Sequence, residues 1–350
     1  MLYFLPNDDI LYDALLKRDP QWDGRAYVTV RTTGIFCRLT CPARKPKREN
    51  CSFHDTVGAC LEAGFRPCKR CHPMAAGGEV DPMVQTLLTQ LEADTSRVWR
   101  EADLSKMGFD PSTVRRSFKR RYGMTFLEMA RHSRLRDSFD SLSEGARVID
   151  AQQDAGFASA SAFREAFARL LGLAPAAFSK QALLRADWIE TPLGSMIAVC
   201  DASNLHLLEF VGRKALPGEL KKLWQGANGS LGFGRFAPTD QIERELQAYF
   251  EGTDARFQTP LALHGSAFTK DVWRALRDIP AGQTRSYGAL ACDLGRPQAT
   301  RAVARANGAN QIAIVIPCHR VLGADGSLTG YGGGLWRKQR LIELERQYLG

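Results

Sequence analysis

The sequence predicts a multidomain α+β protein with a small cysteine-rich α/β domain, an all-α middle domain and an α/β C-terminal domain. Three observations lead to this prediction. The 350 residues are too many for one hydrophobic core of ordinary size. Cysteines gather in the first eighty residues, and a helix-turn-helix pattern occurs twice in the middle. After about residue 185, short β-rich segments appear and are followed by helical ones.

Composition places the chain among globular proteins with a basic balance. Hydrophobic residues make up 44% and charged residues 24%, which excludes a disordered chain and a disulfide-rich miniprotein. Lysine and arginine total 47 against 38 acids, a net charge of +9, which favours a polyanionic partner, first of all nucleic acid. The longest apolar run, 312–316, is far shorter than the roughly 20 residues of a membrane-spanning helix. We therefore expect no membrane-spanning segment. An anionic membrane surface ranks after nucleic acid as the polyanionic partner, and we expect DNA and no membrane.

The amino terminus does not resemble a secretory signal. Residues 1–13 carry three acids and no base, so the basic start of a signal peptide is missing. We expect a cytoplasmic protein, in which thiols stay reduced. Its nine cysteines are then better interpreted as metal ligands or nucleophiles than as disulfides.

Four cysteines form two close pairs, Cys37-x3-Cys41 and Cys68-x2-Cys71. Close pairs let one turn direct two sulfurs toward one ion, so the spacing predicts one Zn²⁺ held by four thiolates. Such a site is purely structural, or it carries a nucleophile when one sulfur is open to solvent, since a bound thiolate is already deprotonated. Rival ligands nearby are Cys51, Cys60, His54 and His72.

The middle of the chain repeats a helix, a glycine turn and a second helix. Val114 and Phe118 lie four residues apart, on the buried face of the second helix in the first copy. Phe163 and Phe167 hold the same places in the second copy.

Positive charge is concentrated on the first copy, because residues 115–136 contain eight bases and one acid. Asp110 or Ser112 is the expected cap of its second helix, with Pro111 in the first turn. A solvated helix face is the alternative interpretation of the exposed bases. The candidates for contacts with DNA bases or phosphates are Arg115, Arg116, Lys119 and Arg164.

The last part of the chain begins with a small sheet. Segments 196–199 and 205–211 are β-rich and separated by polar turn residues. The apolar run 312–316 is predicted to be a strand that ends at Pro317. The predicted helices are 242–250, 268–279, 287–294, 298–307 and 336–348.

The strongest chemical motif is Pro317-Cys318-His319-Arg320. A turn after the proline can present Cys318, with His319 beside it as a base for the thiol proton. We expect this base to lower the cysteine pKa from its usual value of about 8.5 toward neutrality. A cysteine next to a histidine is, on its own, more often structural.

The first eighty residues resemble the amino-terminal domain of the Ada adaptive-response proteins. The resemblance rests on RTTGIFCR at 31–38, CPAR at 41–44 and GFRPCKRC at 64–71. It implies that the four cysteines hold zinc and that Cys37 takes a methyl group from a methylphosphotriester in the DNA backbone. The DNA-contacting positions that it implies are Thr33, Pro42, Arg44 and Arg66.

Methylation of this centre has an electrostatic consequence. Four thiolates around Zn²⁺ carry a formal charge of about −2, and a methyl group on one sulfur changes it to about −1. Repulsion from DNA phosphates then falls, so we expect the methylated protein to bind DNA more tightly.

The two helix-turn-helix units resemble the AraC-type DNA-binding domain, the middle module of Ada proteins. One departure is Phe126, which follows Gly123-Met124-Thr125 where that family usually has proline. The resemblance implies promoter binding and activation of transcription, with double-stranded DNA and RNA polymerase as partners.

Residues 186–350 resemble, over most of their length, the O6-alkylguanine-DNA alkyltransferases. The resemblance implies that Cys318 accepts the alkyl group, that His319 acts as base through a water, and that Glu345 orients the imidazole. The C-terminal domain is then an alkyltransferase whose second half binds DNA in a winged-helix-like way.

The same resemblance assigns further positions around this cysteine. Asn310 would brace the turn, and Tyr287 would donate to the guanine as its oxygen leaves. Arg301 would occupy the gap left in the duplex by the flipped base. The loop 331–335, YGGGL, lines the base pocket, with Gly332 where many members have serine.

We expect an Ada-like, single-use DNA repair methyltransferase that also regulates alkylation-response genes, acts as a monomer and associates with the nucleoid when bound to DNA. Two alternatives stay open: a non-catalytic zinc-containing transcription regulator with a relic alkyltransferase domain, and a thiol redox sensor. The expected domains are 1–78 (zinc, methylphosphotriester acceptor), 82–182 (double helix-turn-helix), 186–262 (alkyltransferase N-terminal subdomain) and 263–350 (catalytic subdomain).

Overall fold

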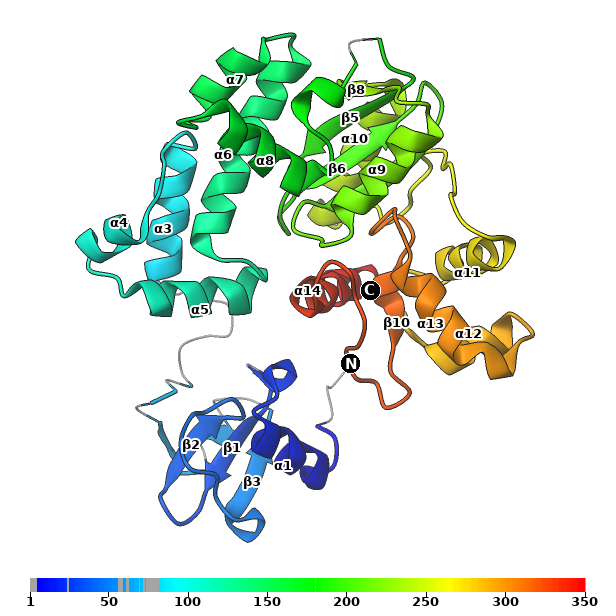
Figure 1. The fold of residues 1–350 in the computed structure, drawn as a ribbon. Coiled ribbons are helices and arrows are strands. Elements are labelled where there is room, and N and C mark those ends of the chain that lie inside the picture. The colour runs from blue at the N-terminus through cyan, green and yellow to red at the C-terminus, as the bar shows by residue number, and fades with distance from the viewer. Residues whose placement is uncertain are drawn as a thin grey trace. The chain divides into compact units, whose positions relative to one another are not determined.

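The computed structural model describes residues 5–23, 25–55, 59–60, 63–68, 70–71, 73, 82–179 and 181–349. The chain divides into two compact units, residues 1–82 and 83–350. Helices and strands occur in both units, which confirms the predicted α+β class (Figure 1).

A four-stranded sheet forms the centre of the first unit. Its elements are α1 (Asp8–Lys17), β1 (Tyr27–Val30), β2 (Ile35–Arg38), β3 (Cys51–His54) and β4 (Arg66–Pro67). The strand order is β3-β1-β2-β4, with β1 antiparallel to both neighbours and β2 parallel to β4. Leu11 and Leu15 of α1 pack with Val28 and Val30 of β1, so one helix covers one face of the sheet.

The second unit begins with the predicted helix-turn-helix repeat. Its helices are α3 (Pro82–Ala93), α4 (Glu101–Lys106), α5 (Pro111–Tyr122), α6 (Phe126–Ser143), α7 (Val148–Asp154) and α8 (Ala160–Leu171). The Asp110 carboxylate accepts a bond from the Thr113 amide at 2.8 Å, so Asp110 rather than Ser112 caps α5. Gly123 and Gly172, both with a positive φ, end α5 and α8.

A second sheet follows the repeat. It contains β5 (Leu184–Ile189), β6 (Met196–Cys200), β7 (Leu205–Phe210) and β8 (Leu231–Phe233), in the order β7-β6-β5-β8. The helices α9 (Leu216–Gly226) and α10 (Ala237–Glu251) accompany it. We did not predict β5, β8 or α9 from the sequence.

Both faces of this sheet are buried. Met196 and Ala198 of β6 pack in one hydrophobic cluster with residues of α10, whereas Ile197 and Val199 pack in another cluster with residues of α9. Because successive side chains of a strand point to opposite faces, the two clusters lie on opposite sides of the sheet. Every residue of β6 is therefore apolar.

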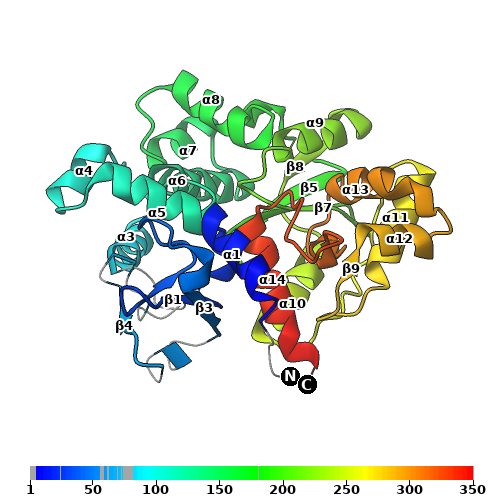
Figure 2. The same cartoon turned by 90° about the horizontal axis from the view of Figure 1, so that it is seen from below.

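The second helix-turn-helix unit shares the α9 side of the sheet. Phe139 of α6 and Phe167 of α8 meet Phe233 of β8, with ring centroids 4.8 and 6.1 Å apart. Helices α8 and α9 lie side by side (Figures 1 and 2). One hydrophobic cluster thus continues from the helical repeat into the sheet.

The C-terminal part is largely helical. It contains α11 (Ala267–Arg277), α12 (Tyr287–Asp293), α13 (Thr300–Gly308) and α14 (Leu335–Glu345), with β9 (Arg285–Ser286) parallel to β10 (Val321–Leu322). Helix α13 packs on α11 and α12, which gives the predicted winged-helix-like arrangement of three helices and a small β pair (Figure 2).

The predicted strand at 312–316 is wrong, because only Ile312 pairs with a strand, in a single bridge to Leu208 of β7, and residues 313–316 form turns and a bend. Ile314 has a φ of 71°, a left-handed conformation that is rare for a β-branched residue. The Ile316 amide donates back to the carbonyl of Ile312 at 3.0 Å. Strand and turn look alike in a short buried apolar run, since both bury every side chain.

Candidate functional site

The predicted metal ligands come together in the first unit. Cys37 lies on β2, Cys41 follows that strand, and Cys68 and Cys71 follow β4. Their four Sγ atoms all lie within 4.8 Å of one another. Sulfurs at about 2.3 Å from a tetrahedral Zn²⁺ are roughly 3.8 Å apart, and Cys41 Sγ and Cys68 Sγ are separated by 4.0 Å. The donor set fits a four-cysteine zinc site, as predicted.

Main-chain amides support these sulfurs. The Arg38 amide donates to Cys71 Sγ at 3.4 Å, and the Arg70 amide donates to Cys68 Sγ at 3.4 Å. Hydrogen bonds of this kind stabilise a negatively charged sulfur.

The rival ligands do not join the cluster within the described residues. Cys51 Sγ donates to a main-chain carbonyl at 3.3 Å. The His54 ring contacts a threonine hydroxyl of β1 at 3.2 Å. Cys60 packs in a separate aromatic cluster. His72 lies outside the described residues.

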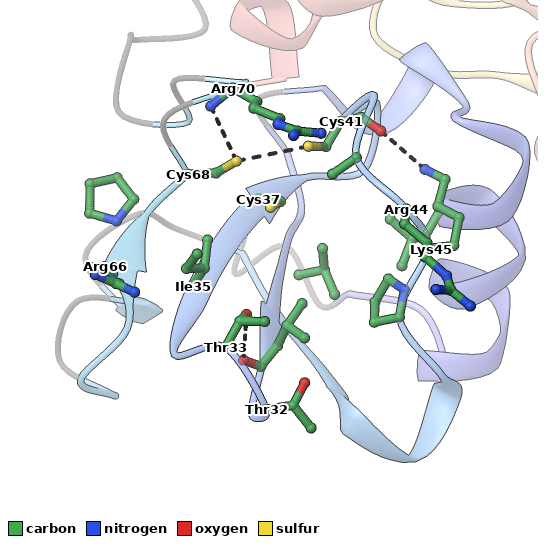
Figure 3. Close-up of a pocket in the computed structure, with 16 residues that line it drawn as sticks. Thr32, Thr33, Ile35, Cys37, Cys41, Arg44, Lys45, Arg66, Cys68 and Arg70 are labelled. Atoms are coloured by element: carbon green, nitrogen blue, oxygen red, sulfur yellow. Dashed lines mark hydrogen bonds between the residues drawn. The ribbon is translucent and has the colours of Figure 1, made fainter.

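A cavity of about 630 Å³ opens beside the cluster (Figure 3). Cys37 lines it together with Thr33, Arg44 and Arg66, three of the four residues expected to contact DNA. Pro42, the fourth, is exposed, and its carbonyl accepts a bond from an arginine of the same unit at 3.1 Å. The side chains of both arginines are exposed, so they are free to approach a phosphate.

Three polar residues of this cavity escaped the sequence analysis: Thr32, Lys45 and Arg70. Lys45 Nζ donates to the carbonyl of Cys41 at 3.3 Å, which holds a positive charge close to the cluster. Both lysine and arginine stand within four residues of a ligand cysteine, and that proximity was the available signal.

The predicted bases of α5 form one exposed face. Arg115, Arg116 and Lys119 are exposed, whereas Val114 and Phe118 on the opposite face are buried. Arg115 forms an ion pair with a glutamate of α4 at 2.6 Å, so part of its charge is already balanced.

Arg164 on α8 is also exposed, and its Nε donates to the carbonyl of Ala160 at 3.2 Å. Phe126 takes the first position of α6 after the capping residue Thr125 and is almost fully buried against the Phe118 ring, with centroids 5.2 Å apart. An aromatic residue in place of proline therefore strengthens the core of the first repeat.

The second candidate site is a turn at Cys318, which lies in a short 3-10 helix and is 6% exposed. Asn310 holds this turn from the side. Its Nδ2 donates to the carbonyl of Ile316 at 2.8 Å and lies 3.1 Å from Cys318 Sγ. Its Oδ1 accepts a bond from the Ile312 amide at 3.0 Å. This one amide group ties the start of the turn at Ile312, which is bridged to Leu208 of β7, to its end at Ile316.

His319 and Glu345 are in direct contact. His319 Nε2 lies 2.7 Å from Glu345 Oε1, at the end of α14, and both residues are almost fully buried. The other ring nitrogen, Nδ1, is buried without a partner among the described residues. The carboxylate therefore fixes the ring while Nδ1 stays available to exchange a proton.

Glu345 has more partners than the sequence suggested. Arg320 donates to both of its oxygens, from Nη2 at 2.7 Å and Nε at 2.8 Å. The hydroxyl of Tyr249, on α10, donates at 2.8 Å. Arg320 stands in the same motif as Cys318, whereas no local pattern marks Tyr249, which is 96 residues away from its partner.

Burial controls the charges of these groups. It raises the pKa of the Cys318 thiol to about 11, against a smaller opposing effect of the bond from Asn310. The expected lowering of this pKa is therefore not what the environment produces. Burial also lowers the pKa of His319, so the imidazole is neutral. Burial alone would raise the pKa of Glu345, but His319 and Arg320 outweigh it and hold that pKa well below its usual value.

Tyr287 lies near Cys318, and Arg301 belongs to α13, the helix whose Asn307 donates to the Cys318 carbonyl at 3.4 Å. Tyr287 begins α12, and its hydroxyl points to the carbonyl of Gly330 at 3.5 Å. Burial and then the nearby Cys318 raise the pKa of Tyr287, which keeps the phenol protonated. Arg301 is exposed on the first turn of α13.

Every helix in the part of the chain that the structure describes is too short or too polar to span a bilayer.

Three families match consecutive parts of the chain. The family described as the metal binding domain of Ada matches residues 11–74. A helix-turn-helix domain family matches residues 104–181. The DNA binding domain of 6-O-methylguanine DNA methyltransferase matches residues 267–347.

Similarity to whole proteins extends over nearly the full length. The chain is 36% identical over 349 residues to the bifunctional transcriptional activator/DNA repair enzyme Ada of Escherichia coli K12, with 97% of each chain covered. It is 33% identical over 356 residues to the regulatory protein ada of Salmonella typhimurium, again with 97% of each covered. A crystal structure of Mycobacterium tuberculosis O6-methylguanine methyltransferase is 41% identical and covers 47% of this chain and 93% of its own, with a TM-score of 0.41. The near-complete coverage at 36% identity shows that the chain belongs to the Ada family.

Proposed function

We propose that this protein is a single-use DNA repair methyltransferase and transcription regulator with two alkyl-accepting cysteines. Cys318 takes alkyl groups from O6-alkylguanine, and Cys37 takes methyl groups from methylphosphotriesters. One observation carries the repair function. Asn310 contacts the buried Cys318 thiol, and Glu345 contacts the buried imidazole of the next residue, His319. The second imidazole nitrogen has no partner among the described residues, so it can take the thiol proton.

At Cys318 the reaction is one displacement. The sulfur forms a bond with the alkyl carbon, and the electron pair of the carbon–oxygen bond goes to the guanine. The thiol proton passes to His319 through a water, and Glu345 stabilises the resulting imidazolium. Tyr287 donates a hydrogen bond to the departing base. The product is a thioether, so each Cys318 acts once.

Access to the buried thiol requires an extrahelical base, because a stacked guanine cannot bring its alkyl carbon to a sulfur that is 6% exposed. Arg301, exposed at the first turn of α13, would fill the gap in the duplex. The helix pair α12 and α13 would carry the DNA contacts of this subdomain.

In the first unit, Cys37, Cys41, Cys68 and Cys71 would hold Zn²⁺, which when bound keeps the sulfurs deprotonated at neutral pH. Thr33, Arg44 and Arg66 would bind the phosphates that flank the lesion, and the cavity would receive the methylated phosphate. Transfer of the methyl group to the Cys37 sulfur removes one negative charge from this surface. DNA affinity then rises, which switches the protein to promoter binding.

The helix-turn-helix repeat would direct the methylated protein to alkylation-response promoters, with double-stranded DNA and RNA polymerase as partners. The bases of α5, Arg115, Arg116 and Lys119, and Arg164 of α8 would make the contacts. We propose that the monomer is the active form, that it acts in the cytoplasm and at the nucleoid, and that the domains are 1–78, 82–182, 186–262 and 263–350.

Mass spectrometry of tryptic peptides tests both acceptors. After incubation with DNA that contains O6-methylguanine and methylphosphotriesters, we expect one methyl group on the Cys318 peptide and one on the Cys37 peptide. An unmodified Cys318 peptide would favour the regulator with a relic domain. Reversible oxidation without methyl transfer would favour the redox sensor.

A further inference from the structure

A buried arginine connects the second sheet to the Cys318 turn. Arg213 follows β7 and is 8% exposed. Its Nη1 donates to the carbonyl of Asn310 at 2.6 Å, and its Nη2 donates to the carbonyl of Gly308 at 3.0 Å. Asn310 is also the residue whose side chain contacts Cys318 Sγ. Arg213 therefore holds the main chain of the residue that positions the thiol.

Two carboxylates hold the guanidinium in place. Glu209, in β7, accepts a bond from Arg213 Nη1, and Glu219 Oε1 lies 3.3 Å from Nη2. Glu209 is almost fully buried, and its second oxygen accepts a bond from the Phe210 amide at 2.9 Å. With both terminal nitrogens engaged, the side chain cannot swing away without leaving buried charges and carbonyls unpaired.

The same guanidinium leaves no room for a side chain at Gly332. A methyl carbon there would lie 2.7 Å from Arg213 Nε and 3.1 Å from its Cζ. The backbone itself does not require glycine at this position, because the φ of Gly332 is not in the left-handed region, unlike that of the neighbouring Gly330 and Gly334. The three atoms nearest to a Cβ at position 332 all belong to Arg213, so this side chain accounts for glycine there.

The pocket around Cys318 brings these residues together. Glu209, Arg213, Asn310, Cys318 and Gly332 line one small cavity. The sheet contributes the ion pair, the turn contributes the cysteine, and the loop before α14 contributes the glycine.

We propose that Arg213 is a positioning residue for alkyl transfer, which fixes the Cys318 turn through the carbonyls of Gly308 and Asn310 and makes glycine obligatory at position 332. This inference rests on the proposed function of Cys318. Arg213 acts through Asn310 and does not touch the alkyl group.

The test is a mutant cycle with the single-turnover rate of methyl transfer to Cys318 at saturating O6-methylguanine DNA. The variants are Gly332→Ser, the charge-neutral pair Glu209→Gln/Arg213→Ala, and the combination of all three. Gly332→Ser should slow transfer roughly tenfold or more. The pair should slow it by a similar factor, because the turn loses its support. Adding Gly332→Ser to the pair should cost no further rate, since the obstructing atoms are gone.

Two further measurements separate positioning from general stability. Arg213→Lys keeps the charge but offers one nitrogen in place of a two-pronged fork. It should lower the saturated rate and leave the half-saturating DNA concentration within about twofold of wild type, in an assay run well below the melting temperatures of both proteins. Gly218→Ser, on the exposed side of α9 with no atom near its Cβ, is the matched control and should match wild type.

Independent, multiplying losses from Gly332→Ser and from the pair would overturn the assignment of Arg213, as would an unchanged rate in Arg213→Lys. Wild-type protein that takes no methyl group on Cys318 would overturn the proposed function, and this inference with it. Methylated wild-type protein with multiplying losses would overturn only the inference.

Discussion

Both candidate acceptor sites use a cysteine sulfur, but the surroundings of the two sulfurs are opposite. Cys37 lies beside a cavity of about 630 Å³ that is bordered by exposed arginines. Cys318 is buried in a cavity with almost no free space, lined by the paired Glu209 and Arg213 and by Asn310. The first site can be reached by the charged DNA backbone at the protein surface, whereas the second must receive a base that has flipped out of the duplex. Access to the sulfur, as well as its reactivity, therefore decides which lesion each cysteine can accept.

The means of activation differ in the same way. Four sulfurs that converge within 4.8 Å need a cation to become stable thiolates. At Cys318, burial raises the pKa of the thiol to about 11, so it stays protonated until a base takes the proton. A permanently charged nucleophile would be costly in that interior.

The largest effect is expected from exchanging each acceptor for serine. Cys318→Ser should abolish methyl transfer from O6-methylguanine and leave transfer to Cys37 intact, because the sites lie in separate units. Cys37→Ser should abolish transfer from methylphosphotriesters and the associated gain in promoter affinity. Peptide mass spectrometry and promoter binding by gel shift measure both. Cys292→Ser, an exposed cysteine on α12, is the control and should behave as wild type. Loss of both activities in either variant would contradict two independent sites.

The next largest effect is expected from removing zinc, which should affect the first unit and not the second. A chelator should unfold residues 1–82, because structural zinc sites contribute about 10–16 kcal/mol to folding in small domains. Methyl transfer to Cys37 should then be lost, while Cys318 keeps its rate. Metal analysis should find one zinc per chain, and limited proteolysis should cleave the first unit. A first unit that stays protease-resistant without metal would contradict a zinc-dependent fold.

Neutralising Glu345, which we call the glutamate hub because it binds His319, Arg320 and Tyr249, should destabilise the second site. Glu345→Gln leaves Arg320 buried without its counter-charge, which costs about 3–5 kcal/mol. Chemical denaturation measures the loss.

The sign of the pH effect follows from the pKa of Glu345, which is held below its usual value. Wild type should keep this stabilisation above about pH 4.3 and lose it as the pH falls toward the folded-state pKa. The Gln variant should be insensitive to pH in that window. Equal acid sensitivity of both proteins would argue against the hub.

A smaller effect is expected in the pH profile of alkyl transfer. Burial lowers the pKa of His319, so the imidazole is a neutral base at pH 7 and above. The wild-type rate should therefore be flat from about pH 7 upward. It should decrease only at pH values below about 6.5, the usual pKa of histidine. His319→Gln should depend on spontaneous thiolate, so its rate should rise about tenfold per pH unit between pH 7 and 9. A flat profile in that variant would contradict the role of the imidazole.

The smallest effect concerns the helix-turn-helix face. Lys119→Gln on α5 should weaken promoter binding and reduce the salt dependence by about one phosphate contact. Lys221→Gln, exposed on α9, is the matched control and should leave the slope unchanged. An equal slope for both variants would show that α5 does not contact DNA phosphates through Lys119.

The sequence alone was enough for features that depend on local spacing. The members of each cysteine pair are only three or four residues apart, so their sulfurs stay close, and the pairing of β2 with β4 then brings the two pairs together. The helix-turn-helix repeat is likewise marked by apolar residues four apart and by glycines that end α5 and α8. In both cases the signal is a short spacing between residues, which the sequence displays directly.

Only the tertiary structure decided the surroundings of Cys318. Its turn is held by the side-chain amide of Asn310 and by Arg213, which follows β7. The histidine beside it is oriented by a carboxylate that also binds Tyr249. None of these contacts produces a repeating pattern in the sequence, because the partners are far apart along the chain. The direction of the thiol pKa also came out opposite to the local expectation, because desolvation depends on everything packed around a group and not on its neighbours in the chain.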